Sequence, residues 1–124
     1  MAQRKYPAVF MRGGTSKAIM FHARDLPAAR AERDAIFLSA MGSPDPYGRQ
    51  LDGMGGGVSS LSKVCVIAPS ARADADIDYT FAQVQVREAR VDCGGNCGNN
   101  GVSRVARGSF YRTARRLFEG CVFA

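Results

Sequence analysis

Residues 6–22 read YPAVFMRGGTSKAIMFH, in which two short apolar runs flank a segment that contains a glycine pair. Apolar runs of this length that are bounded by turn residues are typical of strands. Glycine reaches left-handed backbone conformations without a steric penalty, so Gly13 and Gly14 suit a tight connection. The stretch therefore predicts a strand over 6–11, a turn over 12–16 and a second strand over 17–22. These strands begin a sheet, and the rest of the chain must fit against it.

The segment after these strands predicts a helix and then a long loop. Asp25-Leu26-Pro27 resembles a helix start, and apolar residues recur at near-helical spacing over 28–41. We expect Gly42 to end this helix, because glycine is favoured just beyond helix ends. Residues 43–60 are rich in glycine and proline, which favours an irregular loop. A loop of this length is usually functional or disordered.

Further strands and a second helix are expected in the remainder. Residues 63–68 are β-branched and apolar, and residues 77–81 and 84–86 alternate with period two. Two or three more strands follow from this pattern. The glycine- and asparagine-rich segment 92–100 permits strained backbone, and a helix that begins near Cys97 would direct its N-terminal amides at that thiol. The fold class is therefore α+β.

Size and charge limit the classes of protein that the chain can belong to. With 124 residues, of which 46% are hydrophobic, it holds one modest domain. Its apolar runs are far shorter than the ~20 residues that cross a bilayer, and no signal peptide precedes them, so we expect a cytoplasmic protein without membrane contact. The net charge of +6 divides into +2 over residues 1–101 and +4 over 102–124. Such a basic tail could contact phosphates, but no nucleic-acid-binding motif accompanies it.

The four cysteines are expected to be reduced, and no metal is expected. Cys93 and Cys97 could form half of a zinc site, but the only histidine is His22 and the chain has no second closely spaced cysteine pair. Cys65 lies in an apolar run, where we expect it to be a small buried hydrophobic residue. Cys97 lies among glycines and asparagines and is the strongest candidate for chemistry.

Two further groups could take part in chemistry. Lys63 stands where a polar loop becomes an apolar strand, and a lysine there could be an acid/base group, a carboxylate anchor or an ordinary surface residue. Residues 12–17 combine glycine amides, two hydroxyls and two cations, which could bind an anion or form only a tight turn. The order of residues in this segment is not that of a nucleotide-binding P-loop.

Six ordered motifs together resemble one family, the PrpF-type isomerases, which include 2-methylaconitate isomerase, 3-methylitaconate isomerase and 4-oxalomesaconate tautomerase. The motifs are Phe10-Met11-Arg12-Gly13-Gly14-Thr15-Ser16-Lys17, Arg24-Asp25-Leu26-Pro27, Met41-Gly42-Ser43-Pro44-Asp45, Gln50-Leu51-Asp52-Gly53-Met54-Gly55-Gly56, Ser62-Lys63-Val64 and Asn96-Cys97-Gly98-Asn99. Each motif is short, but their order and spacing over residues 10–99 make the set specific.

The resemblance implies a partial diaminopimelate epimerase-like domain, in which a curved, mostly antiparallel sheet surrounds a central helix headed by Cys97. It also implies an isomerase without cofactor that moves a proton on an unsaturated di- or tricarboxylate. Lys63 and Cys97 match the family's proposed proton-transfer positions. The positions that match substrate-contacting loops are Gly14, Thr15, Ser16, Asn96, Gly98 and Asn99, and a polyanionic substrate would also explain Arg12.

The resemblance ends after Asn99, which suggests a truncated or frame-shifted member of the family. We expect residues 1–101 to be the N-terminal part of an isomerase domain and residues 102–124 to be a divergent basic tail, perhaps helical. A second domain, which normally closes the cleft, would be absent. An inactive fragment and a basic accessory or nucleic-acid-binding module therefore remain alternatives. Faces left uncovered by the missing domain would favour homo-oligomers.

Overall fold

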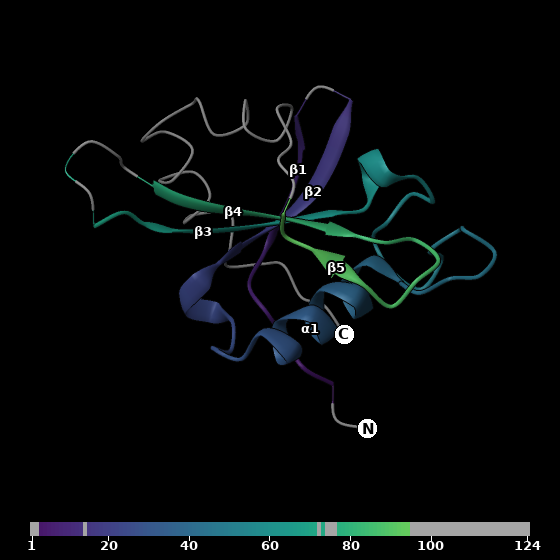
Figure 1. The fold of residues 1–124 in the computed structure, drawn as a ribbon, viewed down its shortest axis with the longest axis horizontal. Helices are drawn as coiled ribbons and strands as arrows, with labels where there is room; N and C mark the ends of the chain where they lie inside the picture. The colour runs from purple at the N-terminus through teal and green to yellow at the C-terminus, as the bar shows by residue number, and fades with distance from the viewer. Residues whose placement is uncertain (1–2, 14, 72, 74–76, 95–124) are drawn as a thin grey trace.

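The chain folds as a mixed sheet with a helix on one of its faces (Figure 1). A computed structural model describes residues 3–13, 15–71, 73 and 77–94. Within this part of the chain the strands are β1 (Val9–Gly13), β2 (Ser16–His22), β3 (Lys63–Pro69), β4 (Ile77–Val84) and β5 (Val91–Asp92). The helix α1 spans Arg30–Met41, and two short 3-10 turns, η1 and η2, span Ala23–Asp25 and Ser59–Leu61.

The predicted strand–turn–strand unit is confirmed. β1 and β2 pair antiparallel from Val9 opposite Met20 to Gly13 opposite Ser16. β1 begins three residues later than predicted, and Pro7 explains part of this difference because proline has no N–H to donate to a strand partner. The connection between the two strands is shorter than the predicted turn over 12–16, because Arg12 and Gly13 belong to β1 and Ser16 belongs to β2.

The strands are ordered β1-β2-β3-β4-β5 across the sheet, and only β2 and β3 run parallel in the described part of the chain. A parallel pair needs a long crossover connection, which α1 and the loop after it provide. The expectation of an α+β domain with a mostly antiparallel sheet is confirmed. The predicted helix that begins near Cys97 lies outside the described residues.

The C-terminal strands differ from the prediction in detail. β4 is one strand through Val84, and the chain then leaves the sheet, so that the Val86 carbonyl accepts a hydrogen bond of 2.8 Å from the Asp45 amide. The expected strand over 84–86 is therefore wrong. β5 has two residues, too few to produce a visible periodicity in the sequence.

α1 begins two residues later than predicted and without the expected aspartate cap. Asp25 belongs to η1, and the residue before the helix is Ala29, whose side chain makes no capping bond. Leu26 has an extended backbone, as residues before proline prefer, so Pro27 separates η1 from α1. At the other end, Gly42 adopts φ 77° and the Ser43 amide bonds to the Leu38 carbonyl at 2.9 Å. Gly42 therefore ends the helix as predicted, with a left-handed cap.

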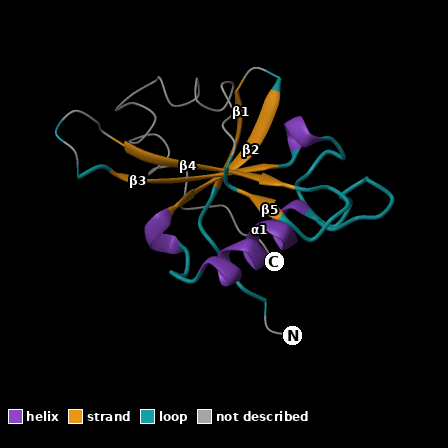
Figure 2. Cartoon of the chain, in the orientation of Figure 1, coloured by secondary structure: helices purple, strands orange, loops and turns teal. Residues whose placement is uncertain are grey.

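The helix α1 covers one face of the sheet (Figure 2), and part of the core lies between them, whereas the core residues Met20, Cys65 and Ile67 lie on the other face. Phe37 of α1 stacks on Phe21 of β2 with ring centroids 5.8 Å apart. The strand register puts Ile19, Val64 and Ala82 on the same face as Phe21, and all three are fully buried. No helix in the described residues is long and apolar enough to cross a membrane.

Candidate functional site

Lys63 is the first residue of β3, and its side chain lies on the sheet face opposite α1. Its register partners are Ala18 on β2 and Gln83 on β4. Because side chains alternate along a strand, Ser16 and Phe81 share this face with Lys63. The Lys63 Nζ donates to the Ser16 Oγ at 3.4 Å and lies 5.6 Å from the centre of the Phe81 ring. A half-buried cation is thus held between a hydroxyl and an aromatic ring.

The parallel pairing of β2 and β3 explains how this contact forms. Both strands start at the same edge of the sheet, so the turn between β1 and β2 lies beside the start of β3. Ser16 is 2% exposed and follows directly on Thr15, which is exposed in the turn. The fold therefore brings together two predicted site residues that are 47 positions apart in the sequence.

Arg12 occupies a different position from the one that its predicted role suggests. It pairs with Lys17 across β1 and β2, and this register puts both side chains on the face opposite Ser16. The Lys17 Nζ lies 5.6 Å from the centre of the Phe10 ring on that face. Arg12 is therefore near the turn but does not share a face with Lys63. Five other predicted site residues lie outside the described residues: Gly14, Asn96, Cys97, Gly98 and Asn99.

A network of amide side chains at the start of β3 is a feature that the sequence did not predict. The Gln83 Nε2 donates to the carbonyls of Ser59 and Ser62, at 2.9 and 2.8 Å. Gln50, only 1% exposed, donates through Nε2 to the Ser62 Oγ at 2.7 Å. Nothing in the composition of a polar loop distinguishes a buried glutamine from a solvated one, so the motif around Gln50 was the only signal.

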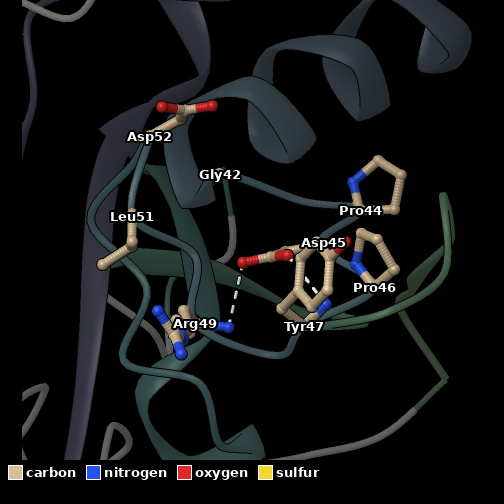
Figure 3. Close-up of a pocket in the computed structure, with 8 residues that line it drawn as sticks. All are labelled: Gly42, Pro44, Asp45, Pro46, Tyr47, Arg49, Leu51 and Asp52. Atoms are coloured by element: carbon tan, nitrogen blue, oxygen red, sulfur yellow. Dashed lines mark hydrogen bonds between the residues drawn. The ribbon is translucent and has the colours of Figure 1, made fainter.

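The loop over 43–60 is irregular as predicted, and Asp45 organises its first half. Its carboxylate accepts the backbone N–H groups of Tyr47 at 2.9 Å, Arg49 at 2.9 Å and Gln50 at 2.8 Å. Figure 3 shows Asp45 between Tyr47 and Arg49, with dashed lines for two of these bonds. The bond from Tyr47, followed by that from Gln50, holds the pKa of Asp45 below its ordinary value.

A surface hollow of about 540 Å³ lies in this loop (Figure 3). It is lined by Gly42, Pro44, Asp45, Pro46, Tyr47, Arg49, Leu51 and Asp52. None of the described site residues predicted from the sequence lines it. The residues that the fold brings together for chemistry and the hollow of the loop are therefore separate features.

The cysteines in the described residues fit the expected difference in environment. Cys65 is fully buried on the same face as Lys63, with its Sγ 3.1 Å from the Tyr79 hydroxyl. The prediction that Cys65 is a buried structural residue is confirmed. Cys93 is exposed just beyond β5, and neither cysteine takes part in a disulfide within the described residues.

The fold is that of a solved isomerase. The chain superposes on a crystal structure of methylitaconate-delta-isomerase with a TM-score of 0.82 and 44% sequence identity, over 92% of this chain and 29% of that one. The sequence model of the PrpF protein family matches residues 3–106. The chain belongs to the PrpF family.

Curated relatives of the chain carry names of isomerases and tautomerases. It is 57% identical over 99 residues to a 4-oxalomesaconate tautomerase of Pseudomonas putida, and the matched region covers 80% of this chain and 27% of that relative. It is 48% identical over 101 residues to a 2-methyl-aconitate isomerase of Cupriavidus necator, with coverages of 78% and 26%. A 3-methylitaconate isomerase of Eubacterium barkeri is 50% identical over 97 residues, with coverages of 78% and 25%. The chain thus spans about a quarter of the length of these relatives.

Proposed function

We propose that the chain acts in a cofactor-independent isomerase that moves a proton on unsaturated di- or tricarboxylates such as 2-methylaconitate or 4-oxalomesaconate. The observation that carries the proposal is the contact between the Lys63 Nζ and the Ser16 Oγ on one sheet face. It occurs in a family whose relatives are named for this class of reaction. These names favour an isomerase over a nucleic-acid-binding module.

The proposed chemistry is the movement of a double bond through proton transfer. One of the two groups, Cys97 or Lys63, accepts a proton from a carbon next to a carboxylate, or from the vinylogous position, and this leaves an enolate-like negative charge on the substrate. The Lys63 ammonium would stabilise this charge, because it is held in a part-buried site. A second group returns a proton to a different carbon, and the double bond moves without oxidation or reduction.

Cys97 is the proposed second proton-transfer group. Lys63, Gln83 and Asp92 are register partners in one row across β3, β4 and β5. Two strand spacings put the Asp92 and Lys63 backbones roughly 10 Å apart. Five residues of extended chain span up to about 17 Å, so the length of chain after Asp92 is compatible with a contact between Cys97 and Lys63. A thiol at a helix start would have a lowered pKa suited to this role.

The proposed substrate contacts lie on both sides of this row. Thr15 and Ser16 present hydroxyls at the turn beside Lys63, and Gly14 would supply an amide there. Asn96, Gly98 and Asn99 would contact the substrate from the segment around Cys97. For Arg12 we propose long-range attraction of a polyanion, since the register puts it on the other face of the sheet.

Hydrogen–deuterium exchange of the substrate tests the proposal. The chain is incubated with 2-methylaconitate or 4-oxalomesaconate in D2O, and proton NMR follows the loss of substrate C–H signals. We expect exchange that is lost in Lys63→Ala and in Cys97→Ser. Lys5→Ala is the matched control, because it removes an exposed lysine that lies outside the motifs assigned to the site and should leave exchange intact. Exchange that persists in Lys63→Ala, or its absence from the folded chain, contradicts the proposal.

A further inference from the structure

The buried side chain of Gln50 connects the loop over 43–60 to the start of β3. Its Nε2 donates to the Ser43 Oγ at 2.8 Å on the loop side and to the Ser62 Oγ at 2.7 Å on the strand side. Its Oε1 accepts the Gly57 amide at 2.9 Å. A buried amide with both donors and its acceptor engaged can occupy one orientation only, because any rotation leaves polar groups unsatisfied.

Ser62 transmits this constraint to Lys63, which follows it directly. Its backbone has φ −128° and ψ 65°, outside the strand region, and its carbonyl accepts the Val84 amide at 3.0 Å and the Gln83 Nε2 at 2.8 Å. Its hydroxyl accepts from Gln50 and donates to the Val84 carbonyl at 2.8 Å. Ser62 is 0% exposed, so water cannot replace either bond. The start of β3 is therefore held at the Ser62 carbonyl by Val84 and Gln83, and at the Ser62 hydroxyl by the side-chain amide of Gln50.

The backbone around Gln50 is built to hold it in place. Gln50 has a backbone φ of 54°, which residues other than glycine rarely adopt. The backbone N–H of Gln50 donates to the Asp45 carboxylate at 2.8 Å, which helps to hold this conformation. A Cβ at Gly55 would overlap with the Gln50 amide, so a side chain there would displace it. Strained backbone of this kind persists where the surroundings fix it, and it is common beside functional sites.

We propose that Gln50 is a positioning residue for Lys63: through Ser62 it sets the start of β3 so that the Lys63 ammonium lies against Ser16 and Phe81. The Lys63 Nζ and the Ser16 Oγ are 3.4 Å apart, at the long end of hydrogen-bond distances, so a shift of the β3 start that moves the ammonium outward breaks the contact. The inference rests on the proposed function, because positioning Lys63 matters for chemistry only if Lys63 transfers or stabilises charge. If Gln50 has this role, a change in the loop over 43–60 also changes the position of the Lys63 ammonium.

Lysine NMR tests the positioning without substrate. The chain has three lysines, Lys5, Lys17 and Lys63, so selective ¹³C labelling of lysine gives a simple spectrum. The Phe81 ring lies near Lys63 and the Phe10 ring lies near Lys17. Each ring current displaces the chemical shift of the lysine beside it, which we call the ring displacement. The Lys17 signal therefore reports on the intact sheet, while the Lys63 signal reports on the site.

We expect Gln50→Met and Ser62→Ala to lose the ring displacement of the Lys63 signal and to keep that of Lys17. Leu51→Ala is the matched control, since Leu51 is the loop neighbour of Gln50 but is 78% exposed, and both displacements should remain. An unchanged Lys63 signal in folded Gln50→Met overturns the proposal. If Gln50→Met unfolds and both displacements disappear, Ser62→Ala decides by the same criterion.

A kinetic measurement then links positioning to chemistry. In the exchange assay we expect kcat to fall about 10- to 100-fold in Gln50→Met, as displaced reacting groups usually cause, with a much smaller change in KM. A rise in KM with an unchanged kcat in Gln50→Met contradicts a positioning role. The lysine signals need no turnover, so their result separates failure of this inference from failure of the proposed isomerase activity.

Discussion

Gly42 and Gly48 are two glycines with the same backbone conformation and different neighbours, and their replacement by alanine gives the sharpest stability prediction. Their φ angles are 77° and 68°. An alanine Cβ at Gly42 would lie 2.7 Å from the Gly53 nitrogen and 3.0 Å from the Gln50 carbonyl oxygen. At Gly48 it would lie 3.3 Å from the Arg87 guanidinium, which belongs to a flexible side chain.

The magnitudes follow from these contacts. Left-handed backbone costs an alanine about 1–2 kcal/mol at either position. Replacing glycine also restricts the unfolded chain, which offsets about 0.4–1 kcal/mol of that cost. Only Gly42→Ala must in addition separate two backbone segments, and overpacking of this kind costs about 1–3 kcal/mol. We therefore expect a loss of about 1 kcal/mol for Gly48→Ala and about 2–4 kcal/mol for Gly42→Ala.

Urea denaturation followed by far-ultraviolet circular dichroism measures both losses, and the chain has no tryptophan that could serve as a fluorescent probe. The unmodified chain and both variants are compared under identical conditions. Equal losses for the two variants would show that the contact between the end of α1 and the loop does not limit stability, and the reasoning would be refuted.

Three further outcomes follow from burial and hydrogen bonding. Phe37→Ala should cost about 3–5 kcal/mol in urea denaturation because Phe37 is 3% exposed, whereas Phe10→Ala, with 37% exposure, should cost much less. Asp45→Ala should destabilise the chain at neutral pH. Because folding lowers the pKa of Asp45, its contribution to stability is fully present above its unfolded pKa of about 4 and is lost as the pH falls through its folded pKa. The stabilities of the unmodified chain and the variant should therefore converge in acid titrations. In thiol labelling with peptide mapping, Cys93 should react in the native chain and Cys65 only after unfolding, and rapid native labelling of Cys65 would contradict its burial.

The sequence was sufficient to predict the elements with strong local signals. The glycine pair of 13–14 predicted where β1 and β2 are connected, and Gly42 predicted the end of α1 because few other residues suit its left-handed backbone. The expected aspartate cap of α1 was wrong since Pro27 forces an extended residue before it. Local rules thus succeeded where one residue dominates and failed where two signals compete.

The candidate site was predictable only in part, because its contacts are non-local. The family motifs selected Ser16 and Lys63, and the parallel pairing of β2 and β3 brings them together. The role of Phe81 beneath Lys63 depends on register across β4, which a single sequence does not define. Gln50 stands in a polar loop, where burial cannot be recognised from composition.

The parallel pairing of β2 and β3 also has a consequence for the order of events during synthesis. α1 depends on contacts within a few turns of chain and can form early, whereas Ser16 must wait for Lys63, 47 positions later. Closing so long a connection has an entropic cost that only the completed sheet repays. We therefore expect a nascent chain on the ribosome to acquire its helix well before the amine and hydroxyl meet.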